Sequence, residues 1–331
     1  MARVFVGMSG GVDSSVTAGL LKQAGHQVVG VYMKNWSQDL PGMRCPWAED
    51  LADAKRVAVC LGIPLKVYDF EIDYRQRVVD YMLAEYRAGR TPNPDIMCNQ
   101  EIKFKLFLET ALADGADLIA TGHYAKKVVV DDKSYLALAT DQKKDQTYFL
   151  YRVTGEALDK TLLPLGELVK SDVRKLAETM GLITADKKDS QGICFVGQVG
   201  IEEFLREYVE VSPGDIIEQE TGRVLGQHKG AIFYTIGQRH GLEIGGGLPY
   251  FVVGKDMTHN QVFVSRNLNQ GGLWVRKIEL RDCFWTHQVP VAGQKYHVRL
   301  RHLAPLIEAE IMASENNTAI IQFTTDQKTI A

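Results

Sequence analysis

The sequence predicts an α/β fold in the first part of the chain and a β-rich part behind it. Short β-branched runs alternate with segments of helical spacing up to about residue 180, as parallel βαβ units require. From residue 214 onward, short alternating strands separated by Gly, Asn and Pro replace the helices. A chain of 331 residues can bury a full core. We therefore expect three domains, at 1–200, 201–270 and 271–331.

The composition is that of a globular protein, because 45% of the residues are hydrophobic and no apolar run is long enough to span a bilayer. The N-terminus leads directly into a strand and lacks the pattern of a signal peptide. We therefore expect a cytoplasmic protein without a membrane partner. Five cysteines in such a chain fit catalytic, metal-binding or buried roles better than a disulfide framework.

The charge is unevenly distributed along the chain. The net charge is −3, which alone argues against a general nucleic-acid binder. Residues 221–301, however, contain eleven Lys and Arg against four Asp and Glu, a net charge of +7 that leaves −10 for the rest. Such asymmetry is typical of a polyanion-binding face, and a solvated basic β surface explains it about equally well.

The stretch SGGVDSS at 9–15 joins the first predicted strand, 3–8, to the first predicted helix, 14–23. Two glycines let the backbone approach an anion, serine hydroxyls donate hydrogen bonds, and the helix offers free N–H groups at its positive end. We call residues 7–14 the phosphate loop. The residues expected to bind the nucleotide here are Gly7, Met8, Ser9, Gly10, Gly11, Val12, Asp13 and Ser14.

No Gly-Lys-Ser/Thr follows the glycines, so the phosphate loop is not a Walker loop, and it lacks GxGxxG. It resembles the PP-loop of ATP pyrophosphatases, enzymes that split ATP between its α and β phosphates. The alternative is an ordinary strand-to-helix turn. In this fold the ends of the strands at 27–33 and 117–121 lie beside the nucleotide. Met33 and Gly122 are therefore candidate nucleotide contacts, and His123 follows Gly122 directly.

Two cysteines lie in polar loops. Cys98 follows the stiff Pro92-Asn93-Pro94-Asp95 loop, at or just before a helix predicted at 99–112, where its thiol pKa would be lowered. Cys194 lies in the Gly-containing loop 187–195. Two unrelated buried thiols are the alternative. Cys60, among apolar neighbours of a predicted helix, is expected in the core.

Five blocks together resemble the tRNA-specific 2-thiouridylase family. They occur in the family's order and, with the phosphate loop, span most of the first 265 residues. They are PNPDIMCNQEIKF at 92–104, ATGHYAK at 120–126, KDQTYFLY at 144–151, KKDSQGICF at 187–195 and YTIGQRHGLEIGG at 234–246. The resemblance implies a Rossmann-like PP-loop domain, a small β-rich central domain and a C-terminal β-barrel-like domain.

The resemblance also implies a reaction. ATP at the phosphate loop would adenylate the C2 carbonyl oxygen of the wobble uridine, with Mg²⁺ offsetting phosphate charge and Asp13 as a candidate for holding the ion or the pyrophosphate's partners. No metal ligand is certain. Cys194 would carry a persulfide whose terminal sulfur attacks the activated carbon, and Cys98 would release it, leaving a Cys98–Cys194 disulfide. Asp95 would be the general acid/base near the flipped uridine.

The implied partners are tRNAs for Lys, Glu and Gln and a sulfur-relay protein or cysteine desulfurase. Arg301-His302 stands where the family usually has Arg-Tyr, which keeps the cation and removes an aromatic contact. Family members usually continue with a Pro-Gly-Gln turn and a Gly-rich strand, so a final barrel ending at Ala331 is expected to be incomplete. The implied tRNA contacts are Asn93, Pro94, Asp95, His123, Lys144, Asp145, Gln146, Arg301 and His302.

Three alternatives stay open. Another PP-loop ligase or amidase would adenylate a carboxylate and need neither loop cysteine. A non-catalytic nucleotide- or RNA-binding module would bind without releasing AMP and pyrophosphate. An iron–sulfur cluster on Cys98 and Cys194 is a minor alternative, because no third nearby cysteine completes a ligand set.

Overall fold

The computed structural model describes residues 1–39, 45–188, 200–245, 248–267, 274–315 and 317–328. Cys194 therefore lies outside the described residues. The chain forms two compact units. Unit 1 comprises Met1–Val79, Pro94–Gly200 and Trp285–His287, and unit 2 comprises Asp80–Asn93, Ile201–Phe284 and Gln288–Ala331. The three-domain division stays a prediction.

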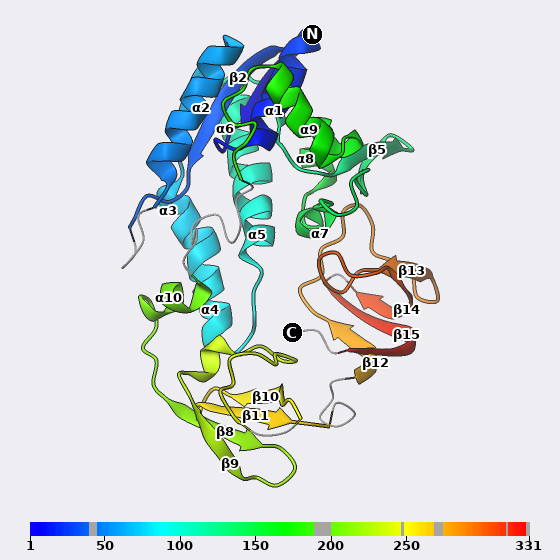
Figure 1. The fold of residues 1–331 in the computed structure, drawn as a ribbon. Helices are drawn as coiled ribbons and strands as arrows, with labels where there is room; N and C mark the ends of the chain where they lie inside the picture. The colour runs from blue at the N-terminus through cyan, green and yellow to red at the C-terminus, as the bar shows by residue number, and fades with distance from the viewer. Residues whose placement is uncertain (40–44, 189–199, 246–247, 268–273, 316, 329–331) are drawn as a thin grey trace. The chain divides into compact units, whose positions relative to one another are not determined.

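Unit 1 is built on a parallel five-stranded sheet in the order β3-β2-β1-β4-β7 (Figure 1). β1 is the central strand, with Val4, Phe5 and Val6 fully buried. Such burial on both faces is typical of a parallel sheet covered by helices. The strands of unit 1 are β1 Arg3–Gly7, β2 Gln27–Lys34, β3 Leu65–Asp69, β4 Leu118–Ala120, β5 Lys126–Val130, β6 Lys133–Ala137 and β7 Thr161–Leu162.

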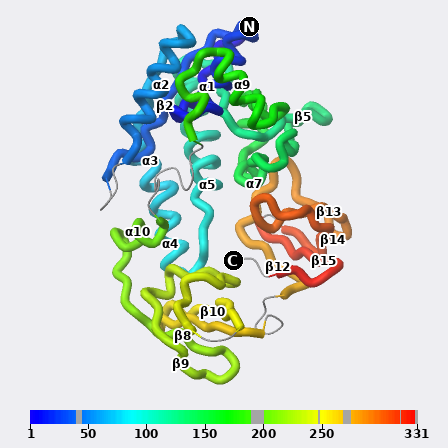
Figure 2. Tube along the Cα trace, viewed as in Figure 1, coloured from blue at the N-terminus to red at the C-terminus, as the bar shows by residue number. Residues whose placement is uncertain are grey.

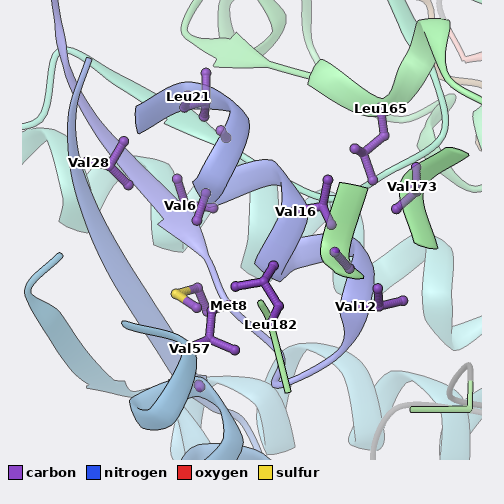
Figure 3. Close-up of a cluster of buried hydrophobic side chains, with 14 of the residues drawn as sticks. Val6, Met8, Val12, Val16, Leu21, Val28, Val57, Leu165, Val173 and Leu182 are labelled. Carbon is purple, nitrogen blue, oxygen red and sulfur yellow. The ribbon is translucent and has the colours of Figure 1, made fainter. Parts of the chain in front are cut away.

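Helices cover both faces of this sheet. Val12 and Val16 of α1, Val57 of α2 and Val173 of α9 pack with Val6 of β1 in one apolar cluster (Figure 3). On the other face, Phe107 of α6 is fully buried and its ring lies 6.4 Å from that of Tyr68 in β3. The bounds of these helices are α1 Val12–Gln23, α2 Trp47–Leu61, α6 Phe107–Ala113 and α9 Lys170–Thr179.

Two longer helical stretches contain π-helical turns. One consists of α3 Glu71–Tyr74, η1 Arg75–Val79 and α4 Asp80–Arg87, and the other of α5 Pro94–Met97, η2 Cys98–Leu106 and α6. The second stretch begins with a proline at its first position, where the missing N–H costs no hydrogen bond. The prediction of a helix from residue 99 was therefore wrong by about one turn, and Asp95 and Cys98 lie inside the helical stretch.

The remaining elements of unit 1 lie beyond β4. β5 and β6 form an antiparallel hairpin whose turn residues Asp131 and Asp132 both have positive φ, as a two-residue turn requires. Gly181, with φ +66°, follows the end of α9. The other helical segments are α7 Thr147–Leu150, α8 Gly155–Asp159 and the 3₁₀ turn η3 Pro164–Glu167.

Unit 2 contains two four-stranded sheets, which can be followed in Figure 2. The first has the order β10-β11-β8-β9, and its β11–β8 pair is parallel. The second, β12-β15-β14-β13, is antiparallel. The strands are β8 Gly214–Glu218, β9 Val224–His228, β10 Phe251–Asp256, β11 Gln261–Ser265, β12 Trp274–Leu280, β13 Lys295–Val298, β14 Ile307–Glu315 and β15 Thr318–Lys328; the helical segments are α10 Ile201–Arg206 and η4 Ala231–Phe233.

A late segment of the chain, Trp285–His287, packs within unit 1. The His287 ring lies 4.4 Å from that of Tyr135 in β6, and its Nε2 is 2.6 Å from the Ser134 carbonyl oxygen. Gly155 leaves room for this ring, because a Cβ there would lie 2.4 Å from Cε1 of His287. The absence of a side chain at Gly155 thus fixes where the imidazole packs.

We expect Gly155→Ala to destabilise the protein by about 1–3 kcal/mol, the usual cost of overpacking. The measurement is the urea midpoint of unfolding. Gly245→Ala is the matched control, because a Cβ at Gly245 would meet nothing within 4 Å. Adding His287→Ala to Gly155→Ala should remove most of the steric penalty, so additive effects of the two changes would contradict this explanation.

Candidate active site

The phosphate loop joins β1 to α1 with a backbone that requires glycine at one position. Gly10 has φ +73°, and a Cβ there would lie 2.4 Å from the carbonyl oxygen of Asp50 in α2. Gly11 is the N-cap of α1 and gives its first turn no side-chain cap. Backbone N–H groups at this helix end therefore remain available to an anion.

The two serines of the loop and the following Ser15 play different parts. The hydroxyls of Ser14 and Ser15 both donate to the Gly11 carbonyl oxygen, at 3.1 and 2.7 Å. Ser14 Oγ also accepts from the Ser9 N–H at 3.2 Å. These bonds hold the turn in shape, whereas Ser9 itself is exposed. Of the three predicted hydroxyl donors, Ser9 is thus the one at the surface.

Asp13 is held by a cation and a phenol. Lys170, the first residue of α9, donates from Nζ to both carboxylate oxygens at 2.8 Å, and Tyr124 donates its hydroxyl to Oδ1 at 2.8 Å. The Lys170 side chain is only 12% exposed. The sequence reasoning missed both partners. Tyr124 follows Gly122-His123 at the end of β4, which is a usable signal, whereas nothing in the sequence marks Lys170.

Two predicted nucleotide contacts lie beside the phosphate loop. A Cβ at Gly122 would come within 2.8 Å of the Ser14 backbone nitrogen, so the chain after β4 packs directly on the start of α1. A Cβ at Gly7 would lie 3.0 Å from Cε of Met33. The carboxyl ends of β1, β2 and β4 therefore meet around the loop, as the crevice rule for parallel sheets predicts.

His123 is buried rather than displayed. Its side chain is 8% exposed, its Nδ1 is 2.8 Å from Thr121 Oγ1, and its ring lies 5.6 Å from that of Phe104 in η2. Burial, and to a lesser extent the positive charge of Lys103, holds the pKa of His123 well below its ordinary value. The imidazole is therefore neutral near pH 7. Its predicted contact with tRNA stays a prediction.

Cys98 begins the π-helical segment η2 and is 1% exposed. The neighbouring Asn99 is 2% exposed and donates from Nδ2 to the Phe149 carbonyl oxygen at 3.0 Å, while its Oδ1 has no partner within the described residues. Asp95 lies one turn earlier, in α5, and is partly buried. Burial raises the pKa of Asp95, and the positive charge of Lys103 opposes this rise.

Residues 144–146, which are predicted to contact tRNA, are held within unit 1 by hydrogen bonds. Asp145 is 1% exposed and accepts from the Ala139 N–H at 2.8 Å and the Thr147 hydroxyl at 2.6 Å. Gln146 exchanges two bonds of 2.9 Å with the backbone of Tyr124. Lys144 is partly exposed. Asp145 and Gln146 thus fix the segment that presents Lys144, and their own contacts with tRNA stay predictions.

The chain leading toward Cys194 is fastened to two helices. Lys187 donates from Nζ to Asp50 and Asp53 of α2, at 2.8 and 2.7 Å. Arg174 of α9 donates to the carbonyl oxygens of Ala185 and Lys187. The pairing of Cys98 with Cys194 stays a prediction. Cys60, expected in the core, is exposed because its helix turns that side away from the apolar cluster, so that prediction was wrong.

The other predicted tRNA residues lie in unit 2 or next to it. Arg301 and His302 are exposed in the segment between β13 and β14. Asn93 belongs to unit 2, while Pro94 opens α5 in unit 1.

Similarity to known proteins covers most of the chain. The chain matches family models described as the tRNA methyl transferase HUP domain, over residues 2–198, and the tRNA methyl transferase PRC-barrel domain, over 202–266. A protein from Chromobacterium violaceum named tRNA-specific 2-thiouridylase MnmA is 46% identical over 321 residues, 93% of this chain and 83% of that protein. One of the same name from Listeria monocytogenes is 50% identical over 285 residues, 86% of this chain and 76% of that protein.

The chain belongs to the tRNA-specific 2-thiouridylase family. The predicted α/β fold class and the resemblance to 2-thiouridylases are therefore confirmed. As a 2-thiouridylase family member it carries the nucleotide-binding domain of the PP-loop enzymes, which implies ATP binding. In the ranges that the structure describes, no helix has the length and apolarity needed to cross a membrane.

The described part of this 2-thiouridylase offers no metal site of its own. Among those residues, no three His, Cys, Asp or Glu side chains come together to hold an ion. Asp13, the candidate ligand, has both oxygens engaged by Lys170. The residues present therefore fit a cation side chain at this position better than a protein-held Mg²⁺.

Asp95→Asn should stabilise the folded 2-thiouridylase near neutral pH. Burial raises the pKa of Asp95 in the folded protein above its ordinary 3.8. As pH rises from 3.8 through this raised pKa, ionisation of the buried carboxyl lowers the stability of the wild-type protein. The variant has no carboxyl to ionise. Urea midpoints of both proteins at about pH 4.5 and about pH 7.5 measure the difference, which should grow with pH. A variant less stable at the higher pH would instead mean that partners stabilise the carboxylate.

Proposed function

We propose that this chain catalyses ATP-dependent 2-thiolation of the wobble uridine of tRNA, giving 2-thiouridine, AMP and pyrophosphate. The phosphate loop is the observation that supports the proposal. Gly122 packs directly against its end, and Lys170 pairs with its Asp13. The chain that carries this loop belongs to the 2-thiouridylase family. The relatives that match it act, by their names, on tRNA. The charge of +7 over residues 221–301 supports a polyanionic substrate.

The adenylation half of the reaction would use the phosphate loop. Backbone N–H groups at the start of α1 and the Ser9 hydroxyl would bind the phosphates of ATP, and Met33 would contact the adenine. Lys170 lies 2.8 Å from both Asp13 oxygens, so a phosphate oxygen can replace one of them without moving the cation far. Mg²⁺ would arrive bound to ATP and supply positive charge at the phosphates. The C2 oxygen of uridine would then attack the α phosphorus and displace pyrophosphate.

The sulfur half would use the two cysteines and Asp95. The terminal sulfur of a Cys194 persulfide would bond to C2 as AMP leaves. The Cys98 thiolate would then attack the Cys194 sulfur, and the electrons of the broken S–S bond would pass to the sulfur on C2. A dithiol must reduce the resulting Cys98–Cys194 disulfide. Asp95, with its raised pKa, would hold or return the proton at the base.

The finer assignments belong to the same proposal. The tRNA contacts would be those predicted from the sequence. Of these, Arg301 and His302 are exposed, and Asn93, Asp95, Lys144 and Gln146 are partly exposed. The substrates would be tRNAs for Lys, Glu and Gln, and the persulfide would come from a sulfur-relay protein or cysteine desulfurase in the cytoplasm. Cys45 is less suited to accept that sulfur than Cys194. Burial is the main cause of a raised pKa of the Cys45 thiol, so less of the reactive thiolate is present.

The first test is nucleoside mass spectrometry of unmodified tRNA incubated with the protein, ATP, Mg²⁺ and a persulfide source. We expect 2-thiouridine with wild type and none with Cys194→Ser or Cys98→Ser, while both variants still release AMP. Cys60→Ser is the control, because Cys60 is exposed and lies on α2. Thiolation retained by Cys194→Ser would reject the persulfide role. AMP release on a small carboxylate without tRNA would favour another PP-loop ligase.

Lys170→Met should impair adenylation by about 100-fold, the usual effect of removing one charged group that meets the transition state. The measurement is tRNA-dependent release of pyrophosphate from ATP. Lys175→Met is the control, because Lys175 lies on the same helix, is 74% exposed and pairs with Asp172. Tyr124→Phe should have a smaller effect, since it removes one hydrogen bond to the Asp13 carboxylate and leaves the two from Lys170. Equal rates for the two lysine variants would exclude Lys170 from the phosphate site.

A further inference from the structure

The outer edge of strand β5 is open in the part of the chain that the structure describes. β5 and β6 form a two-stranded sheet that projects from the rest of unit 1 (Figure 1). Val130 and Lys133 flank the two-residue turn, and in such hairpins this first pair exchanges both of its backbone hydrogen bonds. Bonded and non-bonded pairs alternate along an antiparallel ladder. The backbone N–H and C=O of Lys127 and Val129 therefore point away from β6.

The two edges of the hairpin differ in what covers them. On β6, Ser134 stands opposite Val129, and its outward carbonyl oxygen lies 2.6 Å from His287 Nε2. On β5, the 3₁₀ turn η3 packs against the start of the strand, where a Cβ at Gly166 would lie 2.3 Å from the Ala125 carbonyl oxygen. Farther along, the outward N–H and C=O of Val129 have no hydrogen-bond partner among the described residues. They are available to a further strand.

The open edge is also apolar. Val128, Val129 and Val130 are 39%, 63% and 53% exposed. Their side chains alternate between the two faces of the hairpin, so both faces are apolar at this end. Edge strands are usually protected by a charge, a proline or a bulge near their centre. Between Lys127 and Asp131, β5 has none of these, so a strand that pairs here would bury valines as well as satisfy backbone groups.

The charges on the two sides of the valines have opposite signs. The strand and its turn read KKVVVDD over residues 126–132. Asp131 and Asp132 are exposed, and neither carboxylate has a hydrogen bond or ion pair within the described residues. Asn or Gly would serve a turn of this type without a charge. The hairpin itself therefore does not require the two negative charges at its tip.

We infer that β5 pairs with β5 of a second copy of this chain, antiparallel and with Val129 opposite Val129. The two copies of Val129 exchange two backbone hydrogen bonds, and valines lie opposite valines on both sides of them. The contact is isologous, as two-fold symmetry requires. A strand of five residues is a small interface, so the dimer is weak and depends on concentration. The inference is independent of the proposed function, because this edge contains no residue of the phosphate loop and neither cysteine of the sulfur half-reaction.

The charges select this register. With Val129 at the centre, Lys127 faces Asp131 of the second copy, and Lys126 faces Asp132 of the second copy. Opposite charges across paired strands are stabilising, and like charges are destabilising. Moving the centre by one residue in either direction removes both opposite-charge contacts. The segment KKVVVDD is therefore complementary to itself in a single two-fold register.

Both lysines have donors left for this contact. Lys126 pairs with Glu167 at 2.7 Å, and Lys127 donates to the Leu158 carbonyl oxygen at 3.1 Å. An ammonium group has three N–H donors, so each lysine can add a carboxylate acceptor. Burial lowers the pKa of Lys127, and a carboxylate from the second copy would favour its charged form.

Sedimentation velocity of the full chain, without ATP or RNA, tests the dimer. We expect the mass of wild type to rise from 36.9 kDa toward twice that value, with a Kd of about 1–100 μM. Val129→Pro removes the outward N–H and leaves the β5–β6 ladder intact, so it should raise the Kd about tenfold. Val129→Thr keeps the N–H and is the matched control. Equal Kd values for these two variants would overturn the inference. A wild type that stays monomeric up to about 1 mM would also overturn it, leaving the edge to a strand of a different protein.

A charge variant tests the register without changing the strand. Asp131→Asn combined with Asp132→Asn keeps the turn, because Asn tolerates positive φ. We expect this double variant to raise the Kd about tenfold at low salt and to remove most of its salt dependence. Glu202→Gln combined with Glu203→Gln, on α10, changes the net charge equally and is the control. If both double variants dimerise as wild type does, the inference is wrong.

Discussion

The pair between Lys170 and Asp13 is the interaction on which the site in unit 1 depends. It ties the first turn of α9 to the first turn of α1, and the Tyr124 hydroxyl adds the chain after β4 to the same carboxylate. Residues more than 150 positions apart in sequence thereby meet at one oxygen pair. With the Lys170 side chain only 12% exposed, its charge is poorly screened and acts strongly on whatever anion enters the loop.

The helices that shape the phosphate loop also hold the chain that leads toward Cys194. The backbone of Asp50 packs against Gly10, and its side chain accepts from Lys187. On α9, Lys170 reaches the loop and Arg174, one turn later, reaches the Lys187 carbonyl oxygen. A shift of either helix therefore affects both places. In the proposed reaction the two half-reactions would therefore depend on the same two helices, α2 and α9.

The sequence was sufficient for the parts of the site that are local in the chain. The Gly-Gly turn, the strand ends at Met33 and Gly122 and the class of fold follow from spacing and backbone preferences. Asp13 was recognised as a polar residue of the loop, but its partner Lys170 could not be found, because no local pattern encodes a contact across the fold. His123 and Asp145 were predicted as tRNA contacts, and both are buried because tertiary packing covers them. The helical start at Pro94 was missed because two prolines suggested a loop.

The π-helical segment η2 alters the relation between length and side-chain orientation in the helical stretch from Pro94 to Ala113. Each extra residue per turn changes the direction of every side chain that precedes it by about 100° relative to an ordinary helix. Asp95 precedes η2 and Cys98 is its first residue, whereas Phe104, near its far end, packs on the His123 ring. Removing a single residue between Cys98 and Phe104 would convert π-helical hydrogen bonds into α-helical ones. The Cys98 thiol and the Asp95 carboxyl would then point in a different direction relative to Phe104. The number of residues in η2, rather than their kind, therefore determines how these two side chains are oriented.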